Sequence, residues 1–177
     1  MTQVNARRRS LAVYRTGDNR KGNLMYDRIL VPVDDGEENR RAVEHAAALR
    51  KLSGGRICLL HVVDPLWYAN GRECAAIYFN SVLPAMRRDG QRILQEFRDM
   101  LGDDAVSSEQ VLEESGIRSV PEIIIGQAKQ WGADVIVMGT HGRRGWNRTL
   151  MGSVAEEVAR LAPVPVMLVR PATPKQP

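Results

Sequence analysis

Five short apolar stretches alternate with segments of helical periodicity, and this alternation constrains the fold more than any other feature of the chain. Most of the stretches are continuous runs of Val, Ile and Leu, which is typical of strands buried on both faces of a sheet. Strands of this kind, separated by helices, form a parallel sheet with helices on both faces. The predicted strands are 27–33, 56–63, 106–113, 134–138 and 163–169, and the predicted helices are 37–52, 82–101, 119–130 and 153–161.

The sequence therefore predicts an α/β fold, in which one three-layer, Rossmann-like domain is built on a five-stranded parallel sheet. The chain of 177 residues is 44% hydrophobic and 26% charged, which suits one globular core. Its two cysteines, Cys58 and Cys74, form no disulfide framework and have no metal-site spacing, so a reducing, cytoplasmic location is expected. No stretch approaches the ~18–20 apolar residues of a membrane span, and no membrane association is expected.

Basic residues concentrate at the N-terminus. Residues 1–24 hold six basic groups and one acid, so their charge of +5 exceeds the +4 of the whole chain and leaves the rest slightly acidic. The segment lacks the apolar run of a secretory signal and the interleaved aromatic residues of a nucleic-acid-binding tail. We expect a disordered leader at 1–24, or a true start at Met25, a domain at 25–171 and a frayed tail at 172–177. Nucleic-acid binding is not expected.

A glycine-rich segment follows the fourth predicted strand. Its spacing, from Gly139 through Gly142 to Gly152-Ser153, is Gly-x2-Gly-x9-Gly-Ser. Glycines let the backbone approach an anion closely, and the free N–H groups of a helix start favour phosphate. The segment is neither a P-loop nor a dinucleotide fingerprint. Ligands of open parallel sheets bind beyond the carboxyl ends of the strands, which are here 32–35, 62–64 and 138–142.

Several of these stretches together resemble the universal stress protein family. The matching segments run from Met25 to Asp34, from Leu59 to Val63, from Asp134 to Gly142 and on to Gly152-Ser-Val-Ala-Glu156, and from Val164 to Val169. They cover about 145 residues in the family's order. The resemblance implies a fold of the adenine nucleotide alpha hydrolase type and, because the glycine motif is intact, membership of the ATP-binding subgroup.

The resemblance also implies a ligand, a partner and a set of site residues. The ligand is ATP, or ADP or AMP, with Mg²⁺ or Mn²⁺ held through the phosphates, and the partner is a second copy joined through the last strand, at about 164–169. The implied site residues are Pro32, Val33 and Asp34 on the adenine and ribose side, Val62 meeting adenine through its backbone, Met138, Gly139, Thr140, His141, Gly142 and Arg143 around the ribose and phosphates, and Gly152, Ser153, Val154 and Ala155 at the phosphates.

Simpler roles stand beside these. Ser153 with Glu156 forms a capping-box pattern, which is compatible with a phosphate contact, and Asp34 suits an ordinary turn. No Ser, Cys or acid is placed to form a relay with His141, so we expect it to contact a ligand through its backbone. One or two of three loop arginines are expected to reach the ligand, and two other histidines are given no special role. These residues are Arg143, Arg144 and Arg148, and His45 and His61.

Three functions follow from these observations. The first is a nucleotide-dependent regulatory protein of the stress response that binds ATP. The second is a slow ATPase, although the sequence places no general base and the glycine loop contains no lysine. The third is a dimeric interaction module that needs no nucleotide. We favour the first and expect no catalytic residues.

Overall fold

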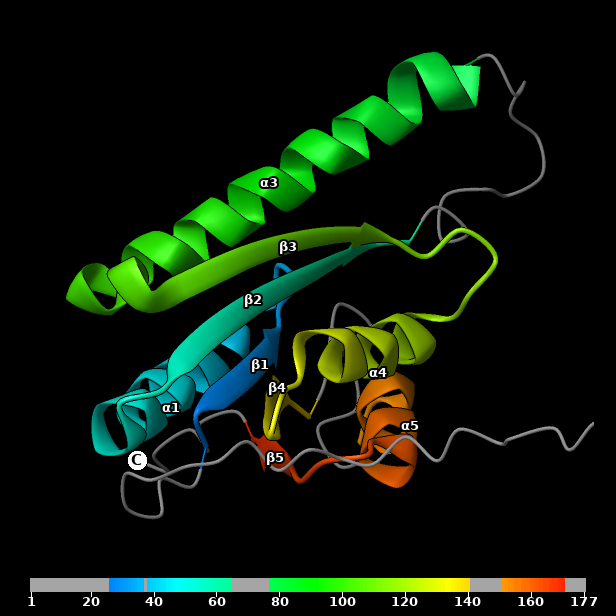
Figure 1. Cartoon of the computed structure of the whole chain (residues 1–177). Helices are drawn as coiled ribbons and strands as arrows, with labels where there is room; N and C mark the ends of the chain where they lie inside the picture. The colour runs from blue at the N-terminus through cyan, green and yellow to red at the C-terminus, as the bar shows by residue number, and fades with distance from the viewer. Residues whose placement is uncertain (1–25, 37, 65–76, 141–150, 171–177) are drawn as a thin grey trace, which may run out of the picture.

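The computed structural model describes residues 26–36, 38–64, 77–140 and 151–170 (Figure 1). Its nine main elements alternate along the chain as the apolar pattern predicts. The strands are β1 (Arg28–Pro32), β2 (Arg56–Val63), β3 (Ser108–Glu114), β4 (Val135–Gly139) and β5 (Val166–Val169), and the helices are α1 (Glu38–Ser53), α3 (Leu83–Met100), α4 (Val120–Trp131) and α5 (Ser153–Leu161). A π-helical turn (Tyr78–Val82) leads into α3, and a 3₁₀ segment (Gly102–Ser107) follows it.

The five strands form one sheet in the order β3-β2-β1-β4-β5, and every pair is parallel. The three-layer α/β prediction is confirmed. β1 pairs with β2 on one side and with β4 on the other, so the chain changes direction across the sheet between β1 and β4. This reversal is the switch point at which open parallel sheets bind their ligands.

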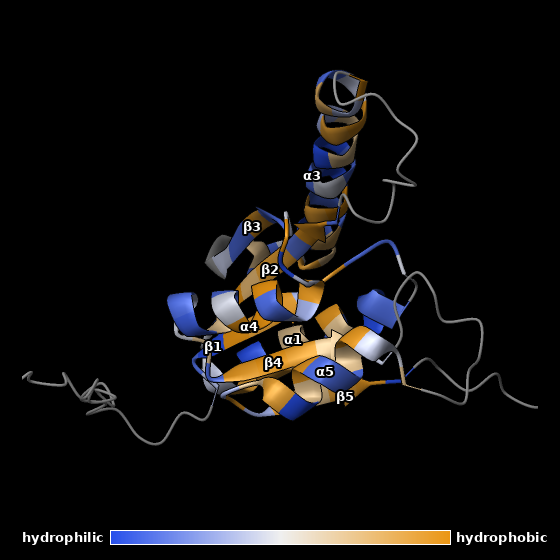
Figure 2. Cartoon of the chain, turned by 90° about the vertical axis from the view of Figure 1, so that its right-hand side faces the viewer, coloured by the Kyte–Doolittle hydropathy of each residue, from blue (hydrophilic) through white to orange (hydrophobic). Residues whose placement is uncertain are grey.

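Two apolar cores lie on opposite faces of the sheet. Because successive side chains of a strand point to opposite faces, Ile29 and Val31 of β1 join one core with α1 and α3, whereas Leu30 joins the other with α4 and α5. Figure 2 shows β4 and β5 in the hydrophobic colour, with mixed colouring on the helices that cover them. The continuous apolar runs in the sequence therefore reflect burial on both faces.

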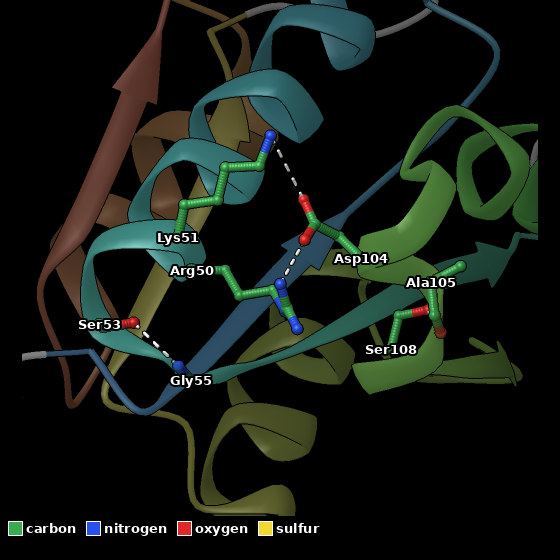
Figure 3. Close-up of polar contacts among 7 residues, drawn as sticks. All are labelled: Arg50, Lys51, Ser53, Gly55, Asp104, Ala105 and Ser108. Carbon is green, nitrogen blue, oxygen red and sulfur yellow. Dashed lines mark hydrogen bonds and ion pairs between the residues drawn. The ribbon is translucent and has the colours of Figure 1, made fainter.

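The third strand begins later than predicted. Residues 102–107 form the 3₁₀ turn instead, and the strand runs from Ser108 to Glu114. Asp104 in this turn pairs with Arg50 and, at 3.8 Å, with Lys51 at the C-terminal end of α1 (Figure 3). The Ser108 hydroxyl closes the turn by donating to the Ala105 carbonyl at 2.8 Å. These polar contacts fix a turn that weak apolar alternation could not reveal.

The last strand is also shorter than predicted, and proline is the reason. Pro163 and Pro165 have no backbone N–H to give to a ladder, so regular pairing starts at Val166. The Pro165 carbonyl still accepts from the Ile136 N–H at 3.0 Å, which starts the pairing with β4.

The capping box predicted at the start of α4 is confirmed. The Glu122 N–H donates to the Ser119 hydroxyl at 3.4 Å, and the Ser119 N–H donates to the Glu122 carboxylate at 2.8 Å. The helix ends at Gly132, which has a left-handed φ of 71° that favours glycine. In the part of the chain that the structure describes, no helix combines the length and apolarity that a membrane span requires.

Candidate functional site

The described residues of the glycine motif converge where β4, β5 and α5 meet. The Thr140 N–H donates to the Val169 carbonyl at 3.0 Å, and the Gly152 N–H donates to the Thr140 carbonyl at 2.8 Å. Thr140 is 5% exposed, so its backbone is held at the end of β4. The two ends of the motif are therefore joined directly, and His141, Gly142 and Arg143 lie outside the described residues together with Arg144 and Arg148.

The start of α5 directs free backbone N–H groups toward this junction. Gly152 is the N-cap residue, with an extended backbone and no side-chain cap, and the first helical bond runs from the Glu156 N–H to the Gly152 carbonyl at 2.9 Å. The N–H groups of Ser153, Val154 and Ala155 consequently have no carbonyl four residues earlier within the helix. Such a helix start attracts anions.

The capping box predicted for Ser153 and Glu156 is wrong. The N-cap position of α5 is occupied by Gly152, so Ser153 is the first residue inside the helix and cannot be its cap. The Ser153 side chain is exposed. Its hydroxyl is therefore not used as the helix cap, which leaves a donor beside the free N–H groups.

Asp34 forms the turn after β1. Its Oδ1 accepts from the Gly36 N–H at 2.8 Å and from the Asn39 side-chain amide, which also donates to the Asp34 carbonyl at 3.1 Å. Asn39 is itself buried in the first turn of α1. The turn role considered for Asp34 is thus confirmed, and the bonds hold its carboxylate at the carboxyl end of β1.

The neighbouring residues present mainly their backbone. Val33 and Met138 are 5% and 6% exposed, and their side chains belong to the two opposite cores. Pro32 is buried as well, whereas Val62 at the end of β2 is half-buried. Ala155 is buried too, so its N–H is the group that remains for a ligand.

His61 has a role that the sequence analysis did not assign. Its imidazole is 5% exposed, and Nδ1 lies 2.8 Å from the Val33 carbonyl oxygen. A carbonyl only accepts, so Nδ1 carries the hydrogen and donates. This buried hydrogen bond was not predicted from the sequence. The available signal was a polar residue inside the apolar run Leu-Leu-His-Val-Val, since a buried polar group needs a partner.

Two groups with a raised pKa, Cys58 and Asp134, lie away from this edge of the sheet. Burial raises the pKa of the Cys58 thiol to about 12, so it stays protonated in the core. Burial also raises the pKa of Asp134, which accepts from the Asp27 and Arg28 N–H groups at the opposite end of β1. Among the residues that the structure describes, no three His, Cys, Asp or Glu side chains gather into a group that could hold a metal ion.

Comparison with known proteins finds relatives of this chain in sequence and in fold. The model of the universal stress protein family matches residues 25–170. Universal stress protein MJ0577 of Methanocaldococcus jannaschii is 28% identical over 163 residues, which cover 84% of this chain and 97% of that protein. The solved structure of MJ0577 superposes with a TM-score of 0.71 at 25% identity, covering 84% of this chain and 99% of its own.

Two further solved structures share the fold and were determined with ligands. A universal stress protein in complex with cAMP is 22% identical, with a TM-score of 0.59 and coverage of 84% of this chain and 99% of its own. The universal stress protein of Archaeoglobus fulgidus in complex with dAMP is 23% identical, with a TM-score of 0.57 and coverage of 82% and 98%. At these identities the likeness establishes the shared fold.

Proposed function

This chain belongs to the universal stress protein family, and we propose that it is a regulatory protein that binds ATP at the β1–β4 switch point. One observation carries the proposal. The bond from the Gly152 N–H to the Thr140 carbonyl, 2.8 Å long, brings the end of β4 against the start of α5. Backbone N–H groups of the helix start and glycine backbone then lie together, as phosphate binding requires.

The adenosine part of the ligand would lie against the ends of β1 and β2. Asp34 suits the ribose because its carboxylate is already oriented by Gly36 and Asn39 and accepts hydrogen bonds. The backbone of Val62 and the turn after Val33 would meet the adenine. The complexes of two family members with cAMP and dAMP support an adenine nucleotide over other anions.

A divalent cation would arrive with the phosphates. No group of described His, Cys, Asp or Glu side chains is built to hold one, whereas Mg²⁺ is commonly bound through substrate phosphates and water. When bound, Mg²⁺ or Mn²⁺ would neutralise phosphate charge beside the α5 N-terminus. The residues of the chain would then bind and orient the nucleotide, and we propose no chemical step on it.

We also propose a homodimer through β5, residues Val166–Val169. This strand is at one edge of the sheet, and Met167 and Leu168 within it, like Val164 just before it, are only half-buried in the single chain. An edge strand offers unpaired backbone groups to another chain. The molecular mass in solution, measured by light scattering, tests this, and a monomer at all concentrations would contradict it. The cytoplasmic location remains a prediction.

Isothermal titration with Mg-ATP, ADP, AMP and GTP tests the nucleotide proposal. We expect binding of adenine nucleotides with Kd below about 1 mM, which corresponds to more than about 4 kcal/mol. An absence of binding at millimolar ATP would overturn the proposal and favour an interaction module that needs no nucleotide. Phosphate release at several turnovers per minute would instead favour an ATPase, so the same preparation is assayed for inorganic phosphate.

A further inference from the structure

We infer that His61 is a positioning residue that ends the β1–β2 ladder and thereby sets the backbone against which the adenine docks. This inference rests on the proposed function and assigns a role to a residue that would not itself touch the nucleotide. Three observations carry it: the bond to Val33, the end of the ladder, and the close fit of α3 over the ring.

The ladder between β1 and β2 stops at the site. Their register ends with Pro32 opposite Leu60, and one more bond runs from the Val33 N–H to the Leu60 carbonyl at 2.8 Å. In a parallel ladder the next bond would run from the Val62 N–H to the Val33 carbonyl. His61 Nδ1 instead donates to that carbonyl at 2.8 Å. A side chain thus takes the place of the last rung.

This substitution has two consequences for the backbone. Alternate residues of a strand direct their N–H and C=O to the same neighbour, so Val62, like Leu60, faces the β1 side. Its polar groups therefore remain beside the carboxyl end of β1 and outside the ladder. The planar trans peptide also directs the Asp34 N–H away from the Val33 carbonyl, toward the β4 side of the switch point. The backbone of Val62 and the Asp34 N–H are thus both available to hydrogen-bond a planar ligand at this edge of the sheet.

Helix α3 keeps the imidazole in its place. A Cβ added at Gly90 would lie 2.7 Å from His61 Cδ2 and 2.6 Å from Leu112 Cδ1, distances that real Cβ contacts do not reach. Only glycine at this point of the helix lets α3 cover the ring so closely, although glycine lowers helix propensity. The ring is accordingly 5% exposed and is confined between α3 and the sheet.

Variants at position 61 separate the donor from the packing. Asn can place an N–H near the position of Nδ1, whereas Leu fills the space without a donor. We expect His61→Leu to weaken Mg-ATP binding by about tenfold, the equivalent of one hydrogen bond, and His61→Asn to retain most of the affinity. Titration calorimetry gives both values, and urea unfolding shows whether each variant is folded. Wild-type affinity in the Leu variant, or equal losses in both variants, would overturn the inference.

A matched pair of helix glycines tests the same contact from the other side. Gly90→Ala pushes on the imidazole, whereas Gly126→Ala in α4 meets no atom within 4 Å. Both changes raise helix propensity equally. We expect only Gly90→Ala to weaken ATP binding, by about threefold or more. Equal affinities in the two folded variants would contradict the proposed placement of His61.

A spectroscopic measurement distinguishes failure of this inference from failure of the proposed function. If the wild-type protein binds no ATP, the proposed function fails, and the role of His61 is then judged without a ligand. Nitrogen NMR should show a protonated Nδ1, and the Asp34 amide signal should shift in His61→Leu but stay close to its wild-type position in His61→Asn. An unprotonated Nδ1 would overturn the positioning role of His61. So would an Asp34 amide signal that keeps its wild-type position in both His61→Leu and His61→Asn.

Discussion

The Gly152 N–H donates to the Thr140 carbonyl at 2.8 Å, and this bond joins β4 to the start of α5 across the glycine motif. Thr140 is in turn bonded to Val169 of β5 at 3.0 Å. The start of α5 is therefore anchored to the end of β4 by a bond between backbone atoms. A side chain at this helix start can be changed without removing the anchor, which makes ligand binding and folding separable.

Ser153→Ala is expected to weaken Mg-ATP binding by about tenfold, because it removes one hydroxyl donor next to the phosphates. The free energy of unfolding should change by less than about 0.5 kcal/mol, since Ser153 is exposed and does not cap its helix. Calorimetric titration and urea unfolding measure the two quantities. A stability loss with unchanged affinity would show that the hydroxyl serves the helix and not the ligand.

Ser119→Ala is expected to give the reverse result. Ser119 forms a complete capping box with Glu122 at the start of α4. Its loss should lower the free energy of unfolding by about 1 kcal/mol, the usual value of an N-cap side chain. Mg-ATP affinity should stay at the wild-type value, because Ser119 follows β3, which β2 and β1 separate from β4 and the glycine motif, and its side chain serves the cap of α4. The Ser153→Ala protein is the natural control, and a loss of affinity in Ser119→Ala would contradict the assignment.

Gly55→Ala is expected to destabilise the fold by about 2 kcal/mol or more through overpacking. A Cβ at this position would lie 2.6 Å from the carbonyl oxygens of both Tyr26 and Asp27. The Asp27 carbonyl cannot move away from the added Cβ without losing the hydrogen bond that it accepts from the Arg56 N–H at 2.7 Å. Thermal unfolding of this variant is compared with that of Gly126→Ala, which has open space and gains helix propensity. Equal melting temperatures would contradict the predicted backbone clash.

The sequence was sufficient for the fold because burial on both faces leaves a strong pattern. Continuous apolar runs such as Ile29–Val31 predict interior strands, and the Ser119–Glu122 spacing predicts a helix start, since both depend on local chemistry. The start of β3 was missed because the turn before it is fixed by Asp104 pairing with Arg50, 54 residues away. Contacts of that separation leave no periodic signal.

The site could be predicted only in part, for a similar reason. The glycine motif is local, so its position after β4 and before α5 was evident from spacing. The role of His61 depends on a carbonyl 28 residues earlier in the chain and on Gly90 of α3 above the ring. The cap of α5 was misassigned by one residue, because Gly152 and Ser153 both suit a helix start and only the backbone geometry decides between them.

Asp134→Asn is expected to change how stability depends on pH. Burial raises the pKa of this carboxyl above its ordinary value of 3.8. The hydrogen bonds that it accepts from the Arg28 and Asp27 N–H groups lower the pKa and so reduce this rise. The folded state therefore holds the proton more tightly than the unfolded state. The carboxyl favours folding most below its ordinary pKa, and this contribution is lost as the pH rises through the raised value.

An Asn oxygen can accept the same backbone bonds without titrating. The stability of the wild type relative to Asp134→Asn should thus fall as the pH rises above about 4, measured by urea unfolding at a series of pH values. Asp103→Asn, at an exposed aspartate, reports the effect of removing one negative charge alone. A difference that rises with pH would show that the backbone hydrogen bonds outweigh burial at Asp134.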